Sequence, residues 1–289
     1  MVSPSARRTG VEYLFEQRGY SQRSASRLVG MCRSSARYVA KPAAEEWVLA
    51  QAVWEEAHKH PSYGYRRVTV ILRRAGWTVN VKRIHRLWRK AGLQVPRRKA
   101  IKRRAGQPCE GLKRAEYPNQ VWTYDFMSAC TERGNKVRIL NIVDEYTREC
   151  LMMLVAPSIA AKKVIQALDW LFLTRGAPAH LRSDNGPEFI AYTIQDWLKQ
   201  HQCQTIYITP GSPWENPFIE SFNGHFRSEL LDRVLFVNGH EAKQLIEQWR
   251  LEYNHERPHS SLGYLTPAAF AAQVGAAQHP PAPVATLSL

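Results

Sequence analysis

Three apolar runs with short links decide the fold, and the first of them, residues 121–129, is Val-Trp-Thr-Tyr-Asp-Phe-Met-Ser-Ala. The second and third are residues 137–146 and 149–156, and Gly134-Asn135 supplies the turn between the first two runs. Runs of apolar and aromatic residues of this length predict strands, and tight links between them predict an antiparallel meander. We therefore expect a sheet that begins with three consecutive antiparallel strands.

Downstream of residue 156 the hydrophobic pattern alternates between helical and strand periods. We expect helices over residues 160–175, 188–201 and 218–232, with short strands over 180–183 and 205–209 between them. The resulting order, βββαβαβα, predicts a mixed α/β sheet with helices packed on it. A further helix over 241–253 leads into a polar loop at 254–259, for which a structural or DNA-contacting role is favoured over a metal site.

The first third of the chain predicts small helical units. Residues 19–38 have the rhythm of a helix-turn-helix, in which Ser21 caps a first helix that ends at Gly30 and Arg33 or Ser34 opens a second. An ordinary helical hairpin is the alternative interpretation. Residues 44–93 predict three more short helices, the last of which begins after Asn80. Five cations between the apolar positions of this last helix are typical of a DNA-binding helix-turn-helix or winged helix, and a solvated face of a structural bundle is the alternative.

The charge is divided unevenly along the chain. Residues 1–106 hold 24 Lys and Arg against 6 Asp and Glu, a net charge of +18, whereas residues 107–289 hold 16 against 19, a net charge of −3. This division predicts a part that binds a polyanion, joined to a part with another task. Nucleic acid is favoured over a membrane surface, because neither a lipidation signal nor an amphipathic anchor accompanies the charge.

Other global features narrow the class of protein. The chain has no run of roughly 18 to 20 apolar residues that could span a membrane, and its N-terminal residues do not form a secretory signal. Its five cysteines are scattered without a Cys-x-x-Cys pair, which argues against a disulfide framework and a cysteine-rich zinc module. We expect a cytoplasmic protein.

Three acids are candidates for one metal site: Asp125 in the first strand, Asp184 directly after the fourth, and Glu220 in the helix after the fifth. Phosphodiester cleavage is commonly driven by two divalent cations about 4 Å apart, one activating the attacking oxygen and one stabilising the leaving oxygen. Mg²⁺ and Mn²⁺ prefer carboxylate ligands. Taken singly, Asp184 could cap a turn and Glu220 could be a solvated helix residue, whereas Asp125 between two aromatic residues has no such simple explanation.

The helix that carries Glu220 is expected to have two different faces. Ile219, Phe222, Phe226 and Leu230 form the apolar face, and the opposite face is polar. On the polar face, Asn223 and Arg227 are candidates for contacting a DNA backbone, and the small Gly224 leaves room for it.

Longer motifs carry a resemblance to a known family. They are His60-Pro-Ser-Tyr-Gly-Tyr-Arg-Arg, Asn80-Val-Lys-Arg-Ile-His-Arg-Leu-Trp-Arg-Lys-Ala-Gly-Leu, Leu140-Asn-Ile-Val-Asp-Glu-Tyr-Thr-Arg-Glu-Cys, Ser183-Asp-Asn-Gly-Pro-Glu-Phe and Tyr253-Asn-His-Glu-Arg-Pro-His-Ser-Ser-Leu-Gly-Tyr. With the three acids, residues 20–275 resemble the second-reading-frame product (OrfB) of bacterial insertion sequences of the IS three family.

The resemblance implies a ribonuclease H-like fold and a DDE transposase or integrase that cleaves element ends and transfers strands. Asp125, Asp184 and Glu220 match the family's metal and catalytic ligands, holding two Mg²⁺ or Mn²⁺ ions, and Arg227 matches a DNA-contacting residue. The implied partners are double-stranded DNA (element ends and target), further copies of the chain on DNA, and the upstream-frame protein or a fusion with it. The implied location is the bacterial cytoplasm, in association with the nucleoid. Pro217-Phe218-Ile219 before Glu220 departs from the family's usual residues, and no zipper heptads of the upstream frame occur.

These observations lead to explicit expectations for domains and contacts. We expect a helical segment at 1–43, a DNA-binding helical domain at 44–95, a basic linker at 96–118, a catalytic core at 119–235, a helical extension at 236–275 and a disordered tail at 276–289. The candidate DNA-contacting residues are Arg66, Arg67, Lys82, Arg83, Arg86, Arg89, Lys90, Arg97, Arg98, Lys99, Lys102, Arg103, Arg104, Asn223 and Arg227. A non-catalytic DNA-binding accessory subunit is the main alternative function, and a structure-selective nuclease is a weaker one.

Overall fold

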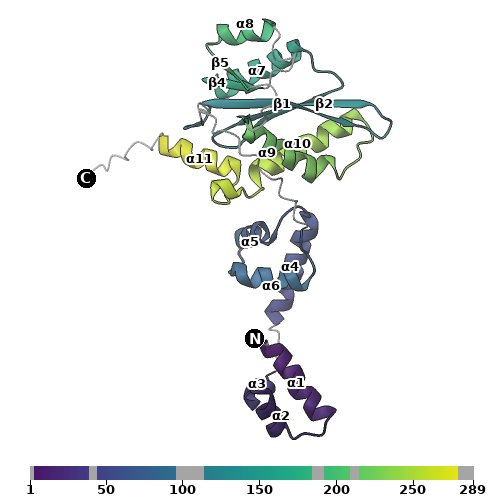
Figure 1. Cartoon of the computed structure of the whole chain (residues 1–289). Helices are drawn as coiled ribbons and strands as arrows, with labels where there is room; N and C mark the ends of the chain where they lie inside the picture. The colour runs from purple at the N-terminus through teal and green to yellow at the C-terminus, as the bar shows by residue number, and fades with distance from the viewer. Residues whose placement is uncertain (1–2, 39–43, 96–113, 184–191, 209–214, 279–289) are drawn as a thin grey trace, which may run out of the picture. The chain divides into compact units, whose positions relative to one another are not determined.

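The computed structural model describes residues 3–38, 44–95, 114–183, 192–208 and 215–278 (Figure 1). The chain divides into two compact units, Met1–Glu55 and Glu56–Leu289, and helix α4 (Ala44–Lys59) contains the boundary between them. None of the described helices is both long and apolar enough to cross a membrane.

The first unit contains three helices that contact one another: α1 (Pro4–Glu16), α2 (Gln22–Val29) and α3 (Arg33–Ala36). The Ser21 hydroxyl accepts from the Ser24 amide at 3.2 Å, and Gly30 ends α2 with a φ of 66°, as the sequence predicts. Arg33 opens the next helix, which is a single turn. The helix-turn-helix rhythm is thus present in the backbone.

The second unit begins with a pair of helices, α5 (Tyr65–Arg74) and α6 (Val81–Lys90), which pack together. Asn80 caps α6 by accepting from the Lys82 amide at 2.8 Å, as expected for this residue type. Ile84, Leu87 and Trp88 are buried, so the apolar stripe of α6 faces inward.

A five-stranded mixed sheet with the order β3-β2-β1-β4-β5 forms the centre of the second unit. Its strands are β1 (Val121–Cys130), β2 (Lys136–Asp144), β3 (Cys150–Ala156), β4 (His180–Ser183) and β5 (Gln204–Tyr207). The first three pair antiparallel, and β4 and β5 join β1 in parallel. The predicted meander and the order βββαβαβα are confirmed.

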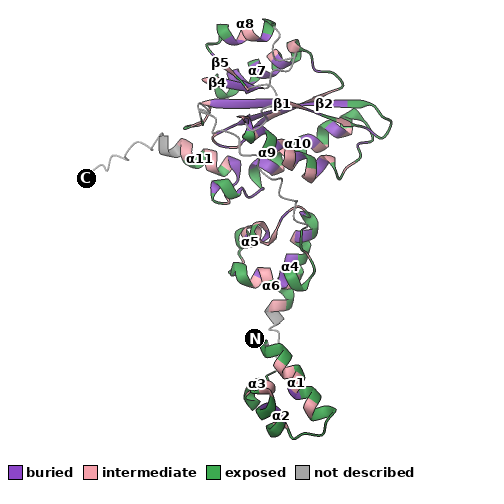
Figure 2. Cartoon of the chain, viewed as in Figure 1, coloured by how far each residue is buried: buried purple, intermediate pink, exposed green. Residues whose placement is uncertain are grey.

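Helices cover both faces of the sheet (Figure 1). Helices α7 (Ala161–Arg175) and α8 (Tyr192–Gln200) bury one face, in a core that includes Trp122 and Tyr124. Helices α9 (Pro217–Phe226) and α10 (Gly239–His255) bury the other, in a core that includes Met127. Figure 2 shows the buried residues concentrated in the strands and on the helix sides that meet them. Since side chains alternate along a strand, Thr123 and Asp125 point with Met127 toward α9.

Three elements differ from their predicted bounds for local reasons. Strand β2 ends at Asp144 because its carboxylate accepts the backbone N–H groups of Tyr146 at 2.7 Å and Thr147 at 3.0 Å, which makes a turn. The helix expected over 218–232 is α9 followed by a π-helical segment, η2 (Arg227–Leu231). Helix α10 continues to His255, so the start of the expected polar loop at 254–259 is helical.

The C-terminal part of the chain adds a 3-10 turn, η3 (Ser260–Leu262), and a helix, α11 (Pro267–Gln278), which contacts α10. The expected tail from residue 276 lies outside the described residues apart from the last turn of α11. Among the described cysteines, Cys32 and Cys130 are exposed, Cys150 and Cys203 are buried, and all four are free thiols.

Candidate functional site

Asp125 lies in the middle of the central strand β1, directly opposite Asn141 of β2. Its side chain is half-buried, and its carboxylate accepts two hydrogen bonds from neutral amides. The Phe126 backbone N–H donates to Oδ1 at 2.7 Å, and the Asn223 side chain donates to Oδ2 at 2.7 Å. These two donors fix the orientation of the carboxylate, whose oxygens are of the kind that bind a divalent cation.

Glu220 lies in the first turns of α9, one turn before Asn223, so the two side chains share one side of the helix. Ile219, Phe222 and Phe226 are buried against the sheet, as the sequence predicts, whereas Glu220 is exposed. Partial burial of its carboxyl raises the pKa of Glu220. Within the described residues its carboxylate has no ion-pair partner, and a bound cation would reverse the shift.

An asparagine pair connects the helix to the strands. Asn141 donates from its side-chain amide to the Asn223 carbonyl oxygen at 2.8 Å, while Asn223 donates onward to Asp125. Asn141 is fully buried in β2, and nothing in the sequence analysis singled it out for a role. The available signal was a polar amide inside the apolar run of β2, since a buried amide requires a partner.

The N-terminal end of α9 is attached to β1 as well. Asn216, the residue before the helix, is buried and accepts from the Thr123 hydroxyl at 2.6 Å. The Arg148 guanidinium lies over the Phe218 ring at 3.7 Å from its centre. Because Thr123 and Asp125 are on the same face of β1, these contacts place the start of α9 beside the strand that carries the first acid.

Asp184 follows Ser183, the last residue of β4, and lies outside the described residues. Strand β4 pairs with β1 in parallel, with Arg182 opposite Thr123. In the parts of the chain that the structure describes, no group of three or more His, Cys, Asp or Glu side chains is gathered as for a metal ion. Asn223 thus joins Asp125 to the helix that carries Glu220, and β4, whose last residue precedes Asp184, pairs with the strand of Asp125.

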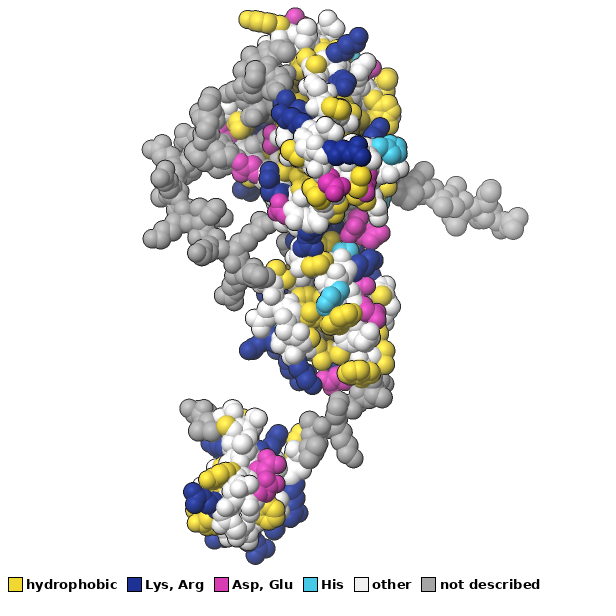
Figure 3. All heavy atoms as spheres, turned by 90° about the vertical axis from the view of Figure 1, so that its right-hand side faces the viewer, with side chains coloured by type: hydrophobic (Ala, Val, Ile, Leu, Met, Phe, Trp, Pro, Cys, Tyr) yellow, Lys and Arg dark blue, Asp and Glu magenta, His cyan; other side chains and the backbone are white. Residues whose placement is uncertain are grey.

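The basic residues of α5 and α6 divide into exposed and packed ones. Arg66, Lys82, Arg86, Arg89 and Lys90 are exposed, and Arg83 is half-buried. Figure 3 shows Lys and Arg side chains on the surface around these helices. Arg67 differs, since its guanidinium lies 5.3 Å from the centre of the Tyr63 ring and burial lowers its pKa. Packing of this kind favours a structural role for Arg67 over a DNA contact.

The remaining predicted contacts have separate positions. Arg227 is exposed at the first residue of η2, directly after the helix of Glu220. Asn223 is occupied by Asp125 and Asn141, which leaves its amide group turned to the protein. Arg97, Arg98, Lys99, Lys102, Arg103 and Arg104 lie outside the described residues.

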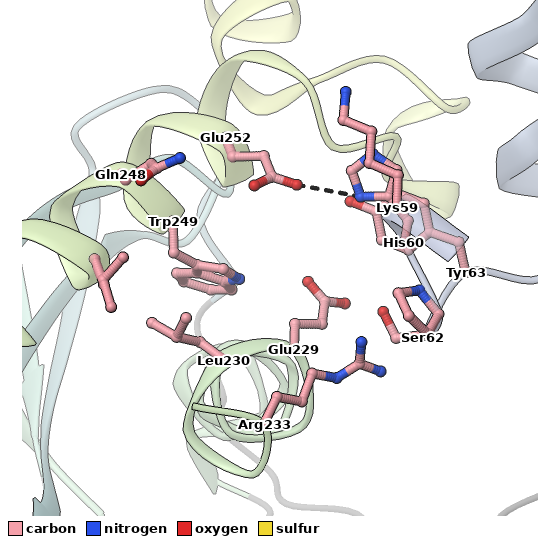
Figure 4. Close-up of a pocket in the computed structure, with 12 residues that line it drawn as sticks. Lys59, His60, Ser62, Tyr63, Glu229, Leu230, Arg233, Gln248, Trp249 and Glu252 are labelled. Carbon is pink, nitrogen blue, oxygen red and sulfur yellow. Dashed lines mark ion pairs between the residues drawn. The ribbon is translucent and has the colours of Figure 1, made fainter. Parts of the chain in front are cut away.

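Neither Asp125 nor Glu220 lines a cavity of about 180 Å³ in the second unit (Figure 4). Its lining comes from the turn after α4, from η2 and from α10, including His60, Glu229 and Glu252. His60 Nδ1 lies 3.2 Å from a Glu252 carboxylate oxygen, and Glu229 forms an ion pair with Arg257 at 2.8 Å. Two motifs of the sequence, those starting at His60 and at Tyr253, thus meet in this region.

Comparison with protein families gives three matches. An integrase core domain matches residues 115–213, a second integrase core domain matches residues 201–267, and an HTH-like domain matches residues 44–100. Together the two integrase matches cover the sheet and α7 to α10.

Whole-chain relatives agree with these matches. The chain is 40% identical over 269 residues to the insertion element IS407 uncharacterized 31.7 kDa protein of Burkholderia multivorans, covering 92% of this chain and 96% of that protein. It is 36% identical to the insertion element IS476 uncharacterized 39.2 kDa protein of Xanthomonas euvesicatoria, over 94% of this chain and 78% of that one. The putative transposase InsK for IS150 of Escherichia coli is 27% identical over 72% of this chain and 77% of that protein.

Among solved structures, a chain of the simian T-cell lymphotropic virus intasome in complex with PP2A regulatory subunit B56 gamma aligns with a TM-score of 0.48 and 14% identity, over 75% of this chain and 73% of that chain. The HTLV-2 integrase catalytic core in complex with magnesium aligns with a TM-score of 0.44 and 17% identity, over 54% of this chain and 98% of that chain. The assignment follows from the sequence relatives and the domain matches. The chain belongs to the integrase-core family of insertion-sequence transposases, in agreement with its resemblance to the second-reading-frame products of the IS three family.

Proposed function

We propose that the chain is a metal-dependent polynucleotidyl transferase that cleaves and joins DNA at the ends of an insertion sequence, with Asp125, Asp184 and Glu220 as its acids. The observation that carries the proposal is the hydrogen bond from Asn223 to Asp125, because it sets the helix face of Glu220 against the strand of the first acid. If Glu220 were only a solvated helix residue, its helix would not need this hydrogen bond from Asn223 to the strand of Asp125.

The carboxylate donor set fits Mg²⁺ or Mn²⁺, which prefer oxygen ligands. Two such ions would activate the attacking oxygen and neutralise charge on the leaving oxygen. The Phe126 and Asn223 amides orient the Asp125 carboxylate, and Glu220 offers a second carboxylate from the neighbouring helix α9. The hydrogen bond from Asn223 orients the Asp125 carboxylate and would keep it from rotating away from the proposed metal site.

The DNA is assigned to the basic helical part. The exposed cations of α6 lie opposite its buried apolar stripe, and such a face suits phosphate contacts. Residues 44–95 would serve as the DNA-binding domain, 96–118 as the basic linker and 119–235 as the catalytic core. Arg227 would hold the DNA backbone beside Glu220, and further copies of the chain and the upstream-frame protein would complete the assembly on the element ends.

The test is cleavage of a labelled element end in Mg²⁺ or Mn²⁺ by the wild type and by Glu220→Gln. Glu132→Gln, an exposed glutamate in the turn between β1 and β2, is the matched control. We expect nicked and joined products from the wild type and the control, and DNA binding without products from Glu220→Gln. Wild-type protein that shifts the DNA but never nicks it would contradict the proposal and favour an accessory DNA-binding role. Products from Glu220→Gln at the wild-type rate would contradict the site assignment.

A further inference from the structure

Arg182 is one of the largest fully buried side chains among the described residues. It is the next-to-last residue of β4, lies opposite Thr123 of β1, and its side chain is 1% exposed. Burying a guanidinium costs free energy unless partners replace the water it loses. The partners of Arg182 therefore indicate what this charge does in the fold.

Arg182 connects three separate segments. Its Nε lies 3.3 Å from Glu145 Oε1, and the Glu145 side chain is completely buried. Its Nη1 donates to the Glu215 backbone carbonyl at 3.1 Å, and Glu215 lies two residues before α9. Glu145 is itself fixed to the central strand, since its backbone N–H donates to the Val121 carbonyl at 3.0 Å. The guanidinium of Arg182, at the end of β4, thus contacts both the turn after β2 and the segment directly before α9.

A second contact holds Asn216, the residue after Glu215, in the same segment before α9. Asn216 accepts from the Thr123 hydroxyl, so Glu215 and Asn216 are attached to two neighbouring parallel strands. Glu220 follows Asn216 by four residues, about one turn of helix. Two attachments at consecutive residues fix both the position of the helix along the sheet and its rotation.

We propose that Arg182, held by Glu145, is a positioning residue that sets where α9 begins and therefore where Glu220 meets Asp125. The proposal rests on the proposed function of those acids. A slip of α9 by one residue moves Glu220 by about 1.5 Å along the helix axis. A misplacement of about 1 Å can lower a catalytic rate by about 10²-fold, so this attachment has consequences for catalysis.

The competing explanation is that Arg182 and Glu145 are an ion pair that matters only for stability. The two explanations separate in the double variant Arg182→Met/Glu145→Leu, because a buried ion pair can often be replaced by apolar residues of similar size without loss of stability. A stabilising pair alone predicts normal cleavage in a folded double variant. A positioning residue predicts a folded protein in which cleavage falls about 10²-fold, because the contact to the Glu215 carbonyl is gone.

Two further variants keep the test decisive if the double variant does not fold. Arg182→Lys retains the buried charge but loses the fork that reaches two partners at once, so cleavage is expected to fall at least tenfold. Thr123→Val removes the contact to Asn216 with little change in size, and a fall of similar size is expected. Folded protein with cleavage within threefold of wild type in both would overturn the proposal.

The matched control is the ion pair between Arg175 and Glu149, whose Nη1 and Oε2 lie 3.1 Å apart. It joins α7, on the opposite face of the sheet, to the residue before β3. Arg175→Met/Glu149→Leu should bind and cleave the labelled DNA within threefold of wild type. A loss in the control as large as in Arg182→Met/Glu145→Leu would show a general effect of removing ion pairs and would overturn the proposal.

Hydrogen exchange tests the attachment without using catalysis. In Arg182→Met/Glu145→Leu and in Arg182→Lys, amides of residues 218–222 should exchange at least tenfold faster than in wild type, with those of β1 and β2 unchanged. Unchanged exchange in α9 would overturn the proposal whether or not the protein cleaves DNA. Wild-type protein that never cleaves would contradict the proposed function alone, and the exchange result would still decide the role of Arg182.

Discussion

The side chain of Asn223 joins α9 to both central strands, because it accepts from Asn141 and donates to Asp125. Replacing it with Ala should lower the free energy of unfolding by about 1–3 kcal/mol, since Asn141 loses a buried acceptor and Asp125 loses a donor. Urea unfolding measures this change. Gln200→Ala, at an exposed position at the end of α8, is the reference, with a change of about 0.5 kcal/mol or less.

Asn223→Asp gives a different expected result at the same position. A second carboxylate beside Asp125 disfavours its ionised form and raises its pKa. Cleavage needs ionised Asp125, so the acid limb of the pH–rate profile should move to higher pH than in wild type. The profile is measured on the labelled element end between about pH 5 and pH 9, where both protonation states can be sampled. An acid limb at the wild-type position would contradict the contact between the two side chains.

At the scale of elements, η2 and the segment that follows α10 are joined by the buried ion pair of Glu229 with Arg257. Arg257→Met should lower the free energy of unfolding by about 3–5 kcal/mol, because Glu229 would stay buried without its partner. Arg257→Met/Glu229→Leu should recover most of this loss. Lys199→Met, which breaks an exposed pair of 3.9 Å, should change stability by about 1 kcal/mol or less. A single variant as stable as the Lys199 control would contradict this account of the buried pair.

His259, beside that ion pair, should make the fold sensitive to acid. Burial, with a further contribution from Arg257, lowers the pKa of His259 to about 2. The unfolded chain takes up this proton near pH 6.5 while the folded chain does not, so stability is present above pH 6.5 and is lost as pH falls below it. His259→Gln, which keeps an acceptor for Arg257, should remove up to about 1.4 kcal/mol per pH unit of this loss between pH 6.5 and 5.5. Equal pH slopes for both proteins in urea unfolding would contradict it.

Local signals explain why most elements could be predicted from the sequence. Asn80 and Ser21 have cap geometry within three residues, and the strands of the meander have short links. The contacts that build the candidate site join distant residues, such as Asn223 and Asp125, which are 98 positions apart. The periodicity of a sequence predicts which face of a helix or strand a residue lies on, but it does not predict which distant residue that side chain contacts. For that reason Asn223 was expected at DNA, and Asn141 and Arg182 were not anticipated.

At the scale of the whole molecule, the net charge of +18 on residues 1–106 should dominate DNA binding. Removing these residues should weaken binding and flatten the dependence of the logarithm of affinity on the logarithm of salt concentration, because fewer counterions are released. Fluorescence anisotropy at several salt concentrations measures both. Removal of residues 279–289, which contain no Lys, Arg, Asp or Glu, is the control and should leave the slope unchanged. Equal affinity and slope after removal of residues 1–106 would contradict the assignment of DNA to the basic part.

Cleavage rates of Asp184→Asn, Glu220→Gln and the double variant show whether Asp125, Asp184 and Glu220 act as one metal site. Residues that act as a unit have non-additive effects on rate. Each single variant should lose about 10³-fold or more in rate, about 4 kcal/mol of transition-state stabilisation, and the double variant should be no slower than either. Asp184→Asn that cleaves the element end at a rate close to wild type, with Glu220→Gln inactive, would contradict the account.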